Sequence, residues 1–119
     1  LVNRQRSAVT HIYFLLARGQ VSRFHRVVHD EIWNFYDGEP LRIITWDGEH
    51  LREDTIGGPA HPPAVVVTGG LFQAAEPLDD FSLVGCTVAP GFEFDDFTFL
   101  SDTEQQQIIA KFPEYKKFV

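Results

Sequence analysis

Two residues of the segment "SRFHRVVHDEIW" carry side chains that could do acid–base chemistry. His25 and Glu31 lie in neighbouring apolar runs, so a sheet could bring the imidazole and the carboxyl together. Histidine side chains titrate near neutral pH, and burial could raise the pKa of a glutamate towards the same range. Such a pair could epimerise or isomerise a sugar or keto acid, and a positioned base contributes about 10²–10⁴ in rate. The pair could equally be a structural polar contact, and both interpretations stay open.

The alternation of side chains along a strand predicts what surrounds this pair. Arg23 shares the face of His25, and Trp33 shares the face of Glu31. An inward Arg23 would suit a carboxylate or phosphate on a ligand, because a guanidinium can donate two parallel hydrogen bonds. The alternative is an ion pair between Arg23 and a nearby acid such as Asp30.

The rest of the chain is expected to form the strands that hold these residues in place. Apolar runs separated by Gly, Pro and Asp predict strands within residues 11–17, 22–27, 31–38, 41–46, 51–58, 61–70, 71–77 and 81–92. Ser101 and Glu104 form a capping-box pattern at the start of a helix, which Pro113 ends. About eight short strands with turns between them are typical of a sandwich, barrel or jelly roll.

Composition and charge exclude several classes of function. The 119 residues are enough for one domain with a core, and 44% of them are hydrophobic. The net charge of −7 argues against binding to nucleic acid or to an anionic membrane surface. No apolar run approaches the about 20 residues that a membrane span needs. The single Cys86 excludes an internal disulfide and favours a reducing, cytoplasmic location, where we expect it to be a small buried hydrophobic residue.

The types and spacing of Gly, His and Glu over residues 19–38 resemble the first motif of the cupin jelly rolls. That motif runs from a glycine to H-x-H, then to a glutamate and to a second glycine. Gly19, His25, Glu31 and Gly38 match it in type and spacing, and Val27 stands where the second histidine is expected. The second cupin motif, P-x-G-x-x-H, is similar to "TGGLFQ" at residues 68–73, in which a glutamine takes the place of the histidine.

The chain also resembles one cupin family of unassigned function, the small epimerase-like or RmlC-like proteins. Residues 22–38, residues 83–97 and "THIYFLL" at 10–16 carry this resemblance. It implies an all-β cupin double-stranded β-helix, or jelly roll, with a short C-terminal helix, a pocket inside the barrel and a homodimer. Relatives carry a segment upstream of Leu1, so residues 1–119 are expected to be a single cupin domain that either lacks an N-terminal segment or starts late.

The cupin pairing of strands implies that His25, Glu31 and Gln73 meet inside the barrel, with Trp33 beside them. His25 and Glu31 are therefore the predicted catalytic residues. Arg23, Trp33 and Gln73 are the predicted contacts of a small polar or anionic ligand. No cofactor is expected, because one histidine, one carboxylate and an amide are a poor set of metal ligands. A divalent metal held by His25, Glu31 and Gln73 is the alternative.

Several functions stay open at this point. The first is a small-molecule-binding cupin without assigned activity, and the second is a cofactor-independent sugar or keto-acid isomerase or epimerase. A degenerate metal-dependent enzyme and a purely structural dimer are the others. The expected partners are a second copy of the chain and a small ligand, not nucleic acid or a membrane. The stretch "APGFEFDDF" is expected to place Phe92, Phe94 and Phe97 in the core or in a subunit interface.

Overall fold

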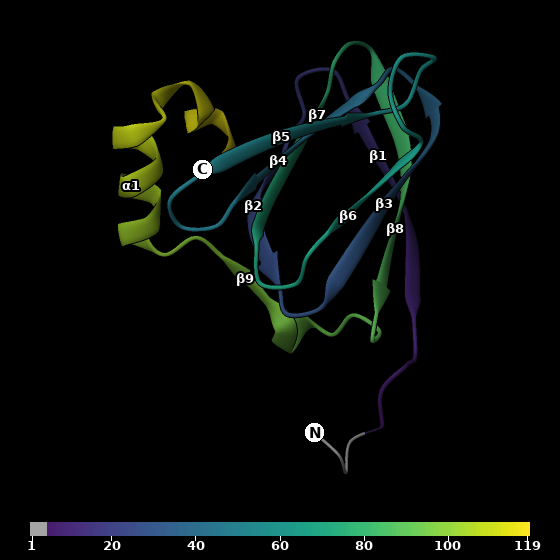
Figure 1. Ribbon diagram of the computed structural model, residues 1–119, viewed down its shortest axis with the longest axis horizontal. Helices are drawn as coiled ribbons and strands as arrows, with labels where there is room; N and C mark the ends of the chain where they lie inside the picture. Colours follow the sequence, from purple (N-terminus) through teal and green to yellow (C-terminus); the bar gives the residue numbers. More distant parts are fainter. Residues whose placement is uncertain (1–4) are drawn as a thin grey trace.

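The computed structural model describes residues 5–119, which form a jelly roll of two antiparallel sheets that face each other (Figure 1). Sheet A has the strand order β1-β8-β3-β6, and sheet B has the order β5-β4-β7-β2-β9. The strands are β1 Thr10–Ala17, β2 Ser22–Val27, β3 Asp30–Gly38, β4 Leu41–Trp46, β5 Leu51–Ile56, β6 Ala64–Val67, β7 Phe72–Pro77, β8 Phe81–Ala89 and β9 Phe97–Phe99. The prediction of an all-β jelly roll with a short C-terminal helix is confirmed.

The strands follow the predicted apolar runs, with one difference near the end of the chain. The run expected over 81–92 is cut short, because β8 ends at Ala89 and Pro90 has no N–H to continue the ladder with β3. A short 3₁₀ helix, Phe94–Asp96, follows, and β9 then pairs antiparallel with β2. Residues 5–119 thus contain nine strands, where about eight were expected.

The turn between β4 and β5 shows how local sequence sets the register of sheet B. Asp47 Oδ1 accepts hydrogen bonds from the backbone N–H of His50 at 2.7 Å and of Glu49 at 2.8 Å. These two bonds lower the pKa of Asp47, because they favour its charged form. Gly48 takes a φ of +105°, which suits a residue without a side chain. Trp46 and Leu51 pair directly after this turn.

The main core fills the space between the two sheets. It is built from the inward positions of both, as the alternation of buried and exposed residues at the start of β3 shows. Its buried members are Leu16, Trp33, Leu41, Ile43, Ile56, Val67, Ala75, Val84 and Cys86. This cluster occupies one part of the interior and leaves the other part to the cavity described below.

A second cluster covers the outer face of sheet B. Helix α1, Asp102–Lys111, and the 3₁₀ helix η2, Pro113–Phe118, pack there, as Figure 1 shows beside β4 and β5. The predicted capping box is confirmed, since Ser101 Oγ accepts from Glu104 N–H at 3.2 Å and Glu104 Oε1 accepts from Ser101 N–H at 2.8 Å. Within the described part of the chain, no helix is long and apolar enough to cross a bilayer.

The outer face of sheet A carries exposed apolar side chains instead of a helix. Tyr13 is 76% exposed, Leu15 58% and Val66 59%. The strand segments 11–15, 32–36, 64–67 and 83–87 contain no Asp, Glu, Lys or Arg. This surface is called the outer A face below.

Candidate functional site

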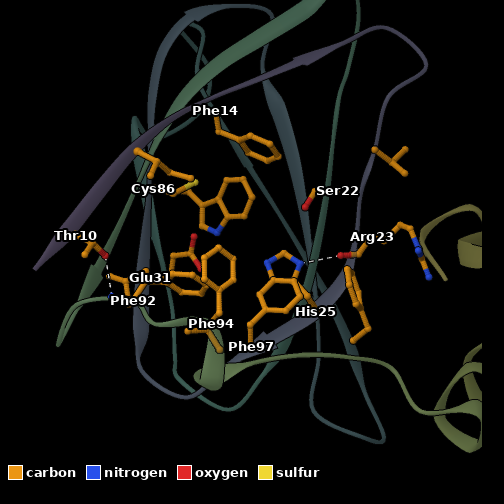
Figure 2. Close-up of a pocket in the computed structure, with 16 residues that line it drawn as sticks. Thr10, Phe14, Ser22, Arg23, His25, Glu31, Cys86, Phe92, Phe94 and Phe97 are labelled. Carbon is orange, nitrogen blue, oxygen red and sulfur yellow. Dashed lines mark hydrogen bonds between the residues drawn. The ribbon is translucent and has the colours of Figure 1, made fainter. Parts of the chain in front are cut away.

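A cavity of about 670 Å³ opens between the sheets, where β1, β2, β3 and β8 meet residues 92–99 (Figure 2). Its volume lies within the range of about 300–1,000 Å³ that is usual for small-molecule sites. Most of the lining is apolar, with a few polar groups. The lining residues are Thr10, Ile12, Phe14, Val21, Ser22, Arg23, His25, Val27, Glu31, Trp33, Cys86, Val88, Phe92, Phe94, Phe97 and Phe99.

His25 enters the cavity from β2 with its ring held in place. Nδ1 lies 2.8 Å from the carbonyl oxygen of Arg23, which can only accept, so Nδ1 carries a hydrogen and donates it. The ring stacks face to face on Phe97, with centroids 5.1 Å apart and planes at 13°. Nε2 is thereby directed into the cavity (Figure 2). It is the nitrogen through which His25 can meet a ligand or a proton.

Glu31 enters from β3 and is 7% exposed. Its Oε1 accepts a hydrogen bond from Gln73 Nε2 at 2.8 Å. Burial raises the pKa of Glu31, and this effect outweighs the nearby His25 and the hydrogen bonds from Gln73 and the Cys86 thiol, which all favour the carboxylate. The carboxyl therefore keeps its proton to a higher pH than a glutamate in water.

Gln73 lies behind Glu31, and both ends of its amide are engaged. The side chain is 1% exposed, and Oε1 accepts from Trp33 Nε1–H at 2.7 Å. An indole nitrogen can only donate, so the amide oxygen must face Trp33 and the NH₂ group must face Glu31. Trp33 lines the cavity with its ring, whereas Gln73 is not among the lining residues. The structure therefore brings His25, Glu31, Trp33 and Gln73 together, and it gives Gln73 the position of a support for Glu31.

Arg23 does not point inward with His25, and that prediction from strand alternation is wrong. The register of β2 against β7 shifts between Ser22 and His25, and such an irregularity breaks the alternation of faces. The Arg23 side chain is exposed, its guanidinium lies over the ring of Phe99 at 5.1 Å, and it points away from the cavity in Figure 2. Arg23 thus lies at the rim, where its contact with a ligand stays a prediction.

The residues present do not fit the metal centre that the cupin fold implies. Val27 occupies the position of the second histidine, and it lines the cavity with a side chain that cannot coordinate. The Gln73 oxygen at the position of the third ligand is bonded to Trp33. Among residues 5–119, no three His, Cys, Asp or Glu side chains are grouped so that they could hold a metal ion. The chemistry considered below therefore uses only the side chains of this chain.

Four phenylalanines that form one side of the cavity were not predicted as site residues. Phe92, Phe94, Phe97 and Phe99, called the phenylalanine wall, belong to neither buried cluster. Phe94 is 86% exposed, so the expected core position is wrong for it, and the alternative of a subunit interface stays a prediction. Residues 90–96 have no regular period, so no pattern in the sequence could have shown which way these rings face.

The β1 side of the cavity did have a signal in the sequence. Thr10, Ile12 and Phe14 alternate along β1, and all three line the cavity. Cys86 is buried, as expected of a small hydrophobic residue, but it also lies against Glu31. Burial, with Glu31 close by, raises the pKa of the Cys86 thiol, so it remains protonated.

Two proteins are similar to this chain over most of its length. A crystal structure of a protein from Shewanella oneidensis is 37% identical with a TM-score of 0.82, and the match covers 98% of this chain and 75% of that one. An uncharacterized protein of Saccharomyces cerevisiae is 28% identical over 114 residues, covering 88% of this chain and 56% of that protein. The chain therefore spans little more than half the length of this curated relative.

Enzymes with the same fold are found at lower identity. A dTDP sugar isomerase from Desulfovibrio desulfuricans is 11% identical with a TM-score of 0.69, over 82% of this chain and 66% of that one. An oxalate decarboxylase from Bacillus subtilis is 15% identical with a TM-score of 0.69, over 91% of this chain and 29% of that one. At such identities the likeness shows the fold alone.

The family match agrees with the fold and with the motif around His25. Residues 2–100 match the family described as "Cupin superfamily (DUF985)", which is most of the chain. The resemblance seen in the sequence is confirmed, and the structural neighbours share the two-sheet architecture. The chain belongs to the cupin superfamily, as a member of its DUF985 family.

Proposed function

We propose that the protein binds a small organic molecule in the cavity, with an apolar body against the phenylalanine wall and a polar group between His25 and Glu31. The observation that carries this proposal is the convergence of these two polar side chains at the inner end of a largely apolar cavity of about 670 Å³. Apolar walls with few convergent polar groups are usual in ligand sites.

The ligand site can be tested with a bulky substitution at the cavity mouth. Ile12 lines the cavity and is 57% exposed, so Ile12→Trp should narrow the entrance without disturbing the core. Leu78→Trp is the matched control, because Leu78 is 51% exposed and does not line the cavity. Small acids, bases and neutral compounds are screened by their effect on the melting temperature.

Compounds that stabilise the wild type and Leu78→Trp, but not Ile12→Trp, would support the proposal. Compounds that stabilise Ile12→Trp equally would bind elsewhere and contradict it. A screen without a single stabilising compound would also count against it.

A cofactor-independent isomerase or epimerase is the second candidate, and the raised pKa of Glu31 favours it. A carboxyl whose pKa is raised is better able to return a proton to a carbon, and His25 Nε2 faces the cavity, where it could remove one. In this reaction one group removes the proton α to a carbonyl, and the other protonates the resulting enediolate. Both steps would use only these two side chains.

Solvent exchange provides the test of this second function. Sugars and keto acids are incubated with the protein in D₂O, and loss of the α-hydrogen is followed by NMR. His25→Asn should abolish the exchange, whereas His50→Asn, the same substitution in an exposed turn outside the cavity, should retain it. Exchange that survives His25→Asn, or no exchange for any compound that binds the cavity, would exclude this activity.

A homodimer is proposed through the outer A face. The exposed apolar residues of this face, including Tyr13 and Val66, would be covered by a second copy. The chain has a net charge of −7, and two copies that meet on an uncharged face keep their like charges apart.

A cytoplasmic location is proposed on the basis of Cys86, which is a free thiol and has no second cysteine to pair with. Cell fractionation with an antibody to the protein provides the test. Recovery of the chain from a secreted or periplasmic fraction would contradict the proposal.

A further inference from the structure

We propose that the cavity takes an organic cation, an amine or quaternary ammonium with apolar substituents, held between the Glu31 carboxylate and the phenylalanine wall. This inference rests on the proposed ligand-binding function and names the chemical class of the ligand. It depends on three features of the cavity: the charges of its lining, the orientation of its rings and the small number of its polar groups.

The charges of the lining favour a cation over an anion. Glu31 is the acidic side chain of the lining, and the guanidinium of Arg23 is directed away from it at the rim. His25 is the other basic side chain of the lining, and its Nδ1 hydrogen is given to a backbone carbonyl. An anion would have to approach the Glu31 carboxylate without an inward arginine, in a chain with a net charge of −7.

The orientation of the rings suits a rounded cationic group. The faces of aromatic rings carry partial negative charge and attract cations within about 6 Å. Phe92 and Phe94 lie at 79° to each other, and Phe97 and Phe99 lie at 85°. Neighbouring rings that are nearly perpendicular present faces in several directions. Such a wall fits the methyl groups of an ammonium ion better than it fits a flat ring.

The small number of polar groups argues against a sugar. A carbohydrate exposes many hydroxyl groups, each of which needs a partner when it is buried. The hydroxyls of the lining are those of Thr10 and Ser22, and Thr10 Oγ1 already accepts from the Phe92 N–H at 2.8 Å. An alkylammonium ion makes no such demand, because its charge is met by Glu31 and by the ring faces.

Two probes of the same shape can show whether the cavity recognises the charge of a ligand or only its shape. Choline and 3,3-dimethylbutan-1-ol differ in a nitrogen that replaces a carbon, and 3,3-dimethylbutanoate supplies the corresponding anion. Their affinities are measured by titration with NMR or calorimetry. We expect choline to bind at least about fivefold more tightly than the neutral alcohol, in line with the usual strength of cation–π contacts with a counter-ion.

Two variants, the first with a matched control, show which residues cause the preference for a cation. Glu31→Gln should reduce the affinity for choline to about that of the alcohol, whereas Glu49→Gln, which removes the same charge from an exposed turn, should leave it unchanged. Phe94→Leu should weaken choline more than the alcohol, because it removes an exposed ring of the wall, keeps an apolar side chain and leaves the stacking of Phe97 on His25 intact.

The outcomes distinguish this inference from the proposed function. Equal binding of choline and the alcohol, or tightest binding of the butanoate, would contradict the proposed preference for a cation. Neither result would contradict the proposal that the cavity binds a small molecule. If none of the three probes binds while the screen yields compounds that Ile12→Trp blocks, the cation is again wrong and the site stands. If the screen also fails, both proposals fall.

Discussion

The indole Nε1–H of Trp33 donates to Oε1 of Gln73 at 2.7 Å, and this bond determines which end of the amide reaches Glu31. The three side chains form a buried chain that runs from the core to the floor of the cavity. Because a tryptophan can only donate, the NH₂ group of Gln73 is committed to the carboxyl. Gln73 therefore holds the Glu31 carboxyl in position from the core side, although Gln73 itself does not line the cavity.

Replacing Gln73 should cost stability. Gln73→Leu leaves the Trp33 N–H and the Glu31 carboxyl without their buried partners, so we expect a loss of about 2–4 kcal/mol in the free energy of unfolding. Urea denaturation measures it, and Gln106→Leu on the exposed side of α1 is the control. If Gln73→Leu lowers the free energy of unfolding no more than Gln106→Leu does, the hydrogen bonds of Gln73 do not stabilise the fold.

The stability contributed by Glu31 should fall as the pH rises. Its pKa is raised in the folded protein, so folding favours the protonated form and stability is lost when the pH passes the folded pKa. His25 on β2, Gln73 on β7 and Cys86 on β8 face this carboxyl. Glu31→Gln does not titrate, so its stability relative to the wild type should increase as the pH rises above about 4, the ordinary range of a glutamate.

Chemical denaturation at several pH values provides the measurement for Glu31→Gln. Asp47→Asn is an informative comparison, because the pKa of Asp47 is lowered and its contribution is lost when the pH falls. A difference between Glu31→Gln and the wild type that does not change with pH would contradict the raised pKa.

Binding of a cation should weaken on acidification. Protonation of Glu31 removes the counter-ion, and the raised pKa moves this loss to a higher pH than for an ordinary glutamate. Titrations with choline over a pH series measure the effect, and 3,3-dimethylbutan-1-ol should show a much smaller slope. Glu31→Gln removes the titrating carboxyl, so it should reduce the pH dependence of choline binding. Equal slopes for the two probes would refute the role of Glu31.

We expect the capping box of α1 to make a measurable contribution to the free energy of unfolding. Ser101→Ala removes the acceptor for the Glu104 N–H and should lower the stability by about 1 kcal/mol. Thr103→Ala, in the same exposed turn, is the control. Thermal unfolding of both variants gives the comparison. Equal melting temperatures would show that the capping box adds nothing to the stability that the buried Ile108 gives the helix.

The proposed dimer can be tested with a charge on the outer A face. Tyr13→Lys places like charges opposite each other across a two-fold axis, or close to it, and should dissociate the dimer. Light scattering after gel filtration measures the mass, with Leu78→Lys as the control on another exposed surface. A monomeric wild type, or a Tyr13→Lys variant of unchanged mass, would exclude this interface.

The sequence predicted the strands well, because their alternation and turn residues are local properties. The turn at Asp47, the capping box at Ser101 and the shared face of Glu31 and Trp33 on β3 all follow from short segments. The neighbourhood of His25 and Glu31 came from the cupin motif, which fixes how distant strands pair.

Other parts of the site could not be predicted, for reasons that lie outside local pattern. The irregularity in β2 has no residue signature, and it moves Arg23 to the rim. The phenylalanine wall depends on how residues 90–99 leave β8 and return to β2, which no periodicity records. The support that Gln73 gives to Glu31 depends on the single donor of Trp33, a contact between strands that are far apart in the sequence.

The C-terminal segment packs on the outer face of sheet B, and the cavity lies against the inner face of the same sheet. Phe24 packs on Phe118 with ring centroids 6.1 Å apart, and the next residue, His25, faces the opposite way into the cavity. A substitution at Phe118 would therefore act on the site through Phe24 and the backbone of β2, because no residue of the C-terminal segment lines the cavity.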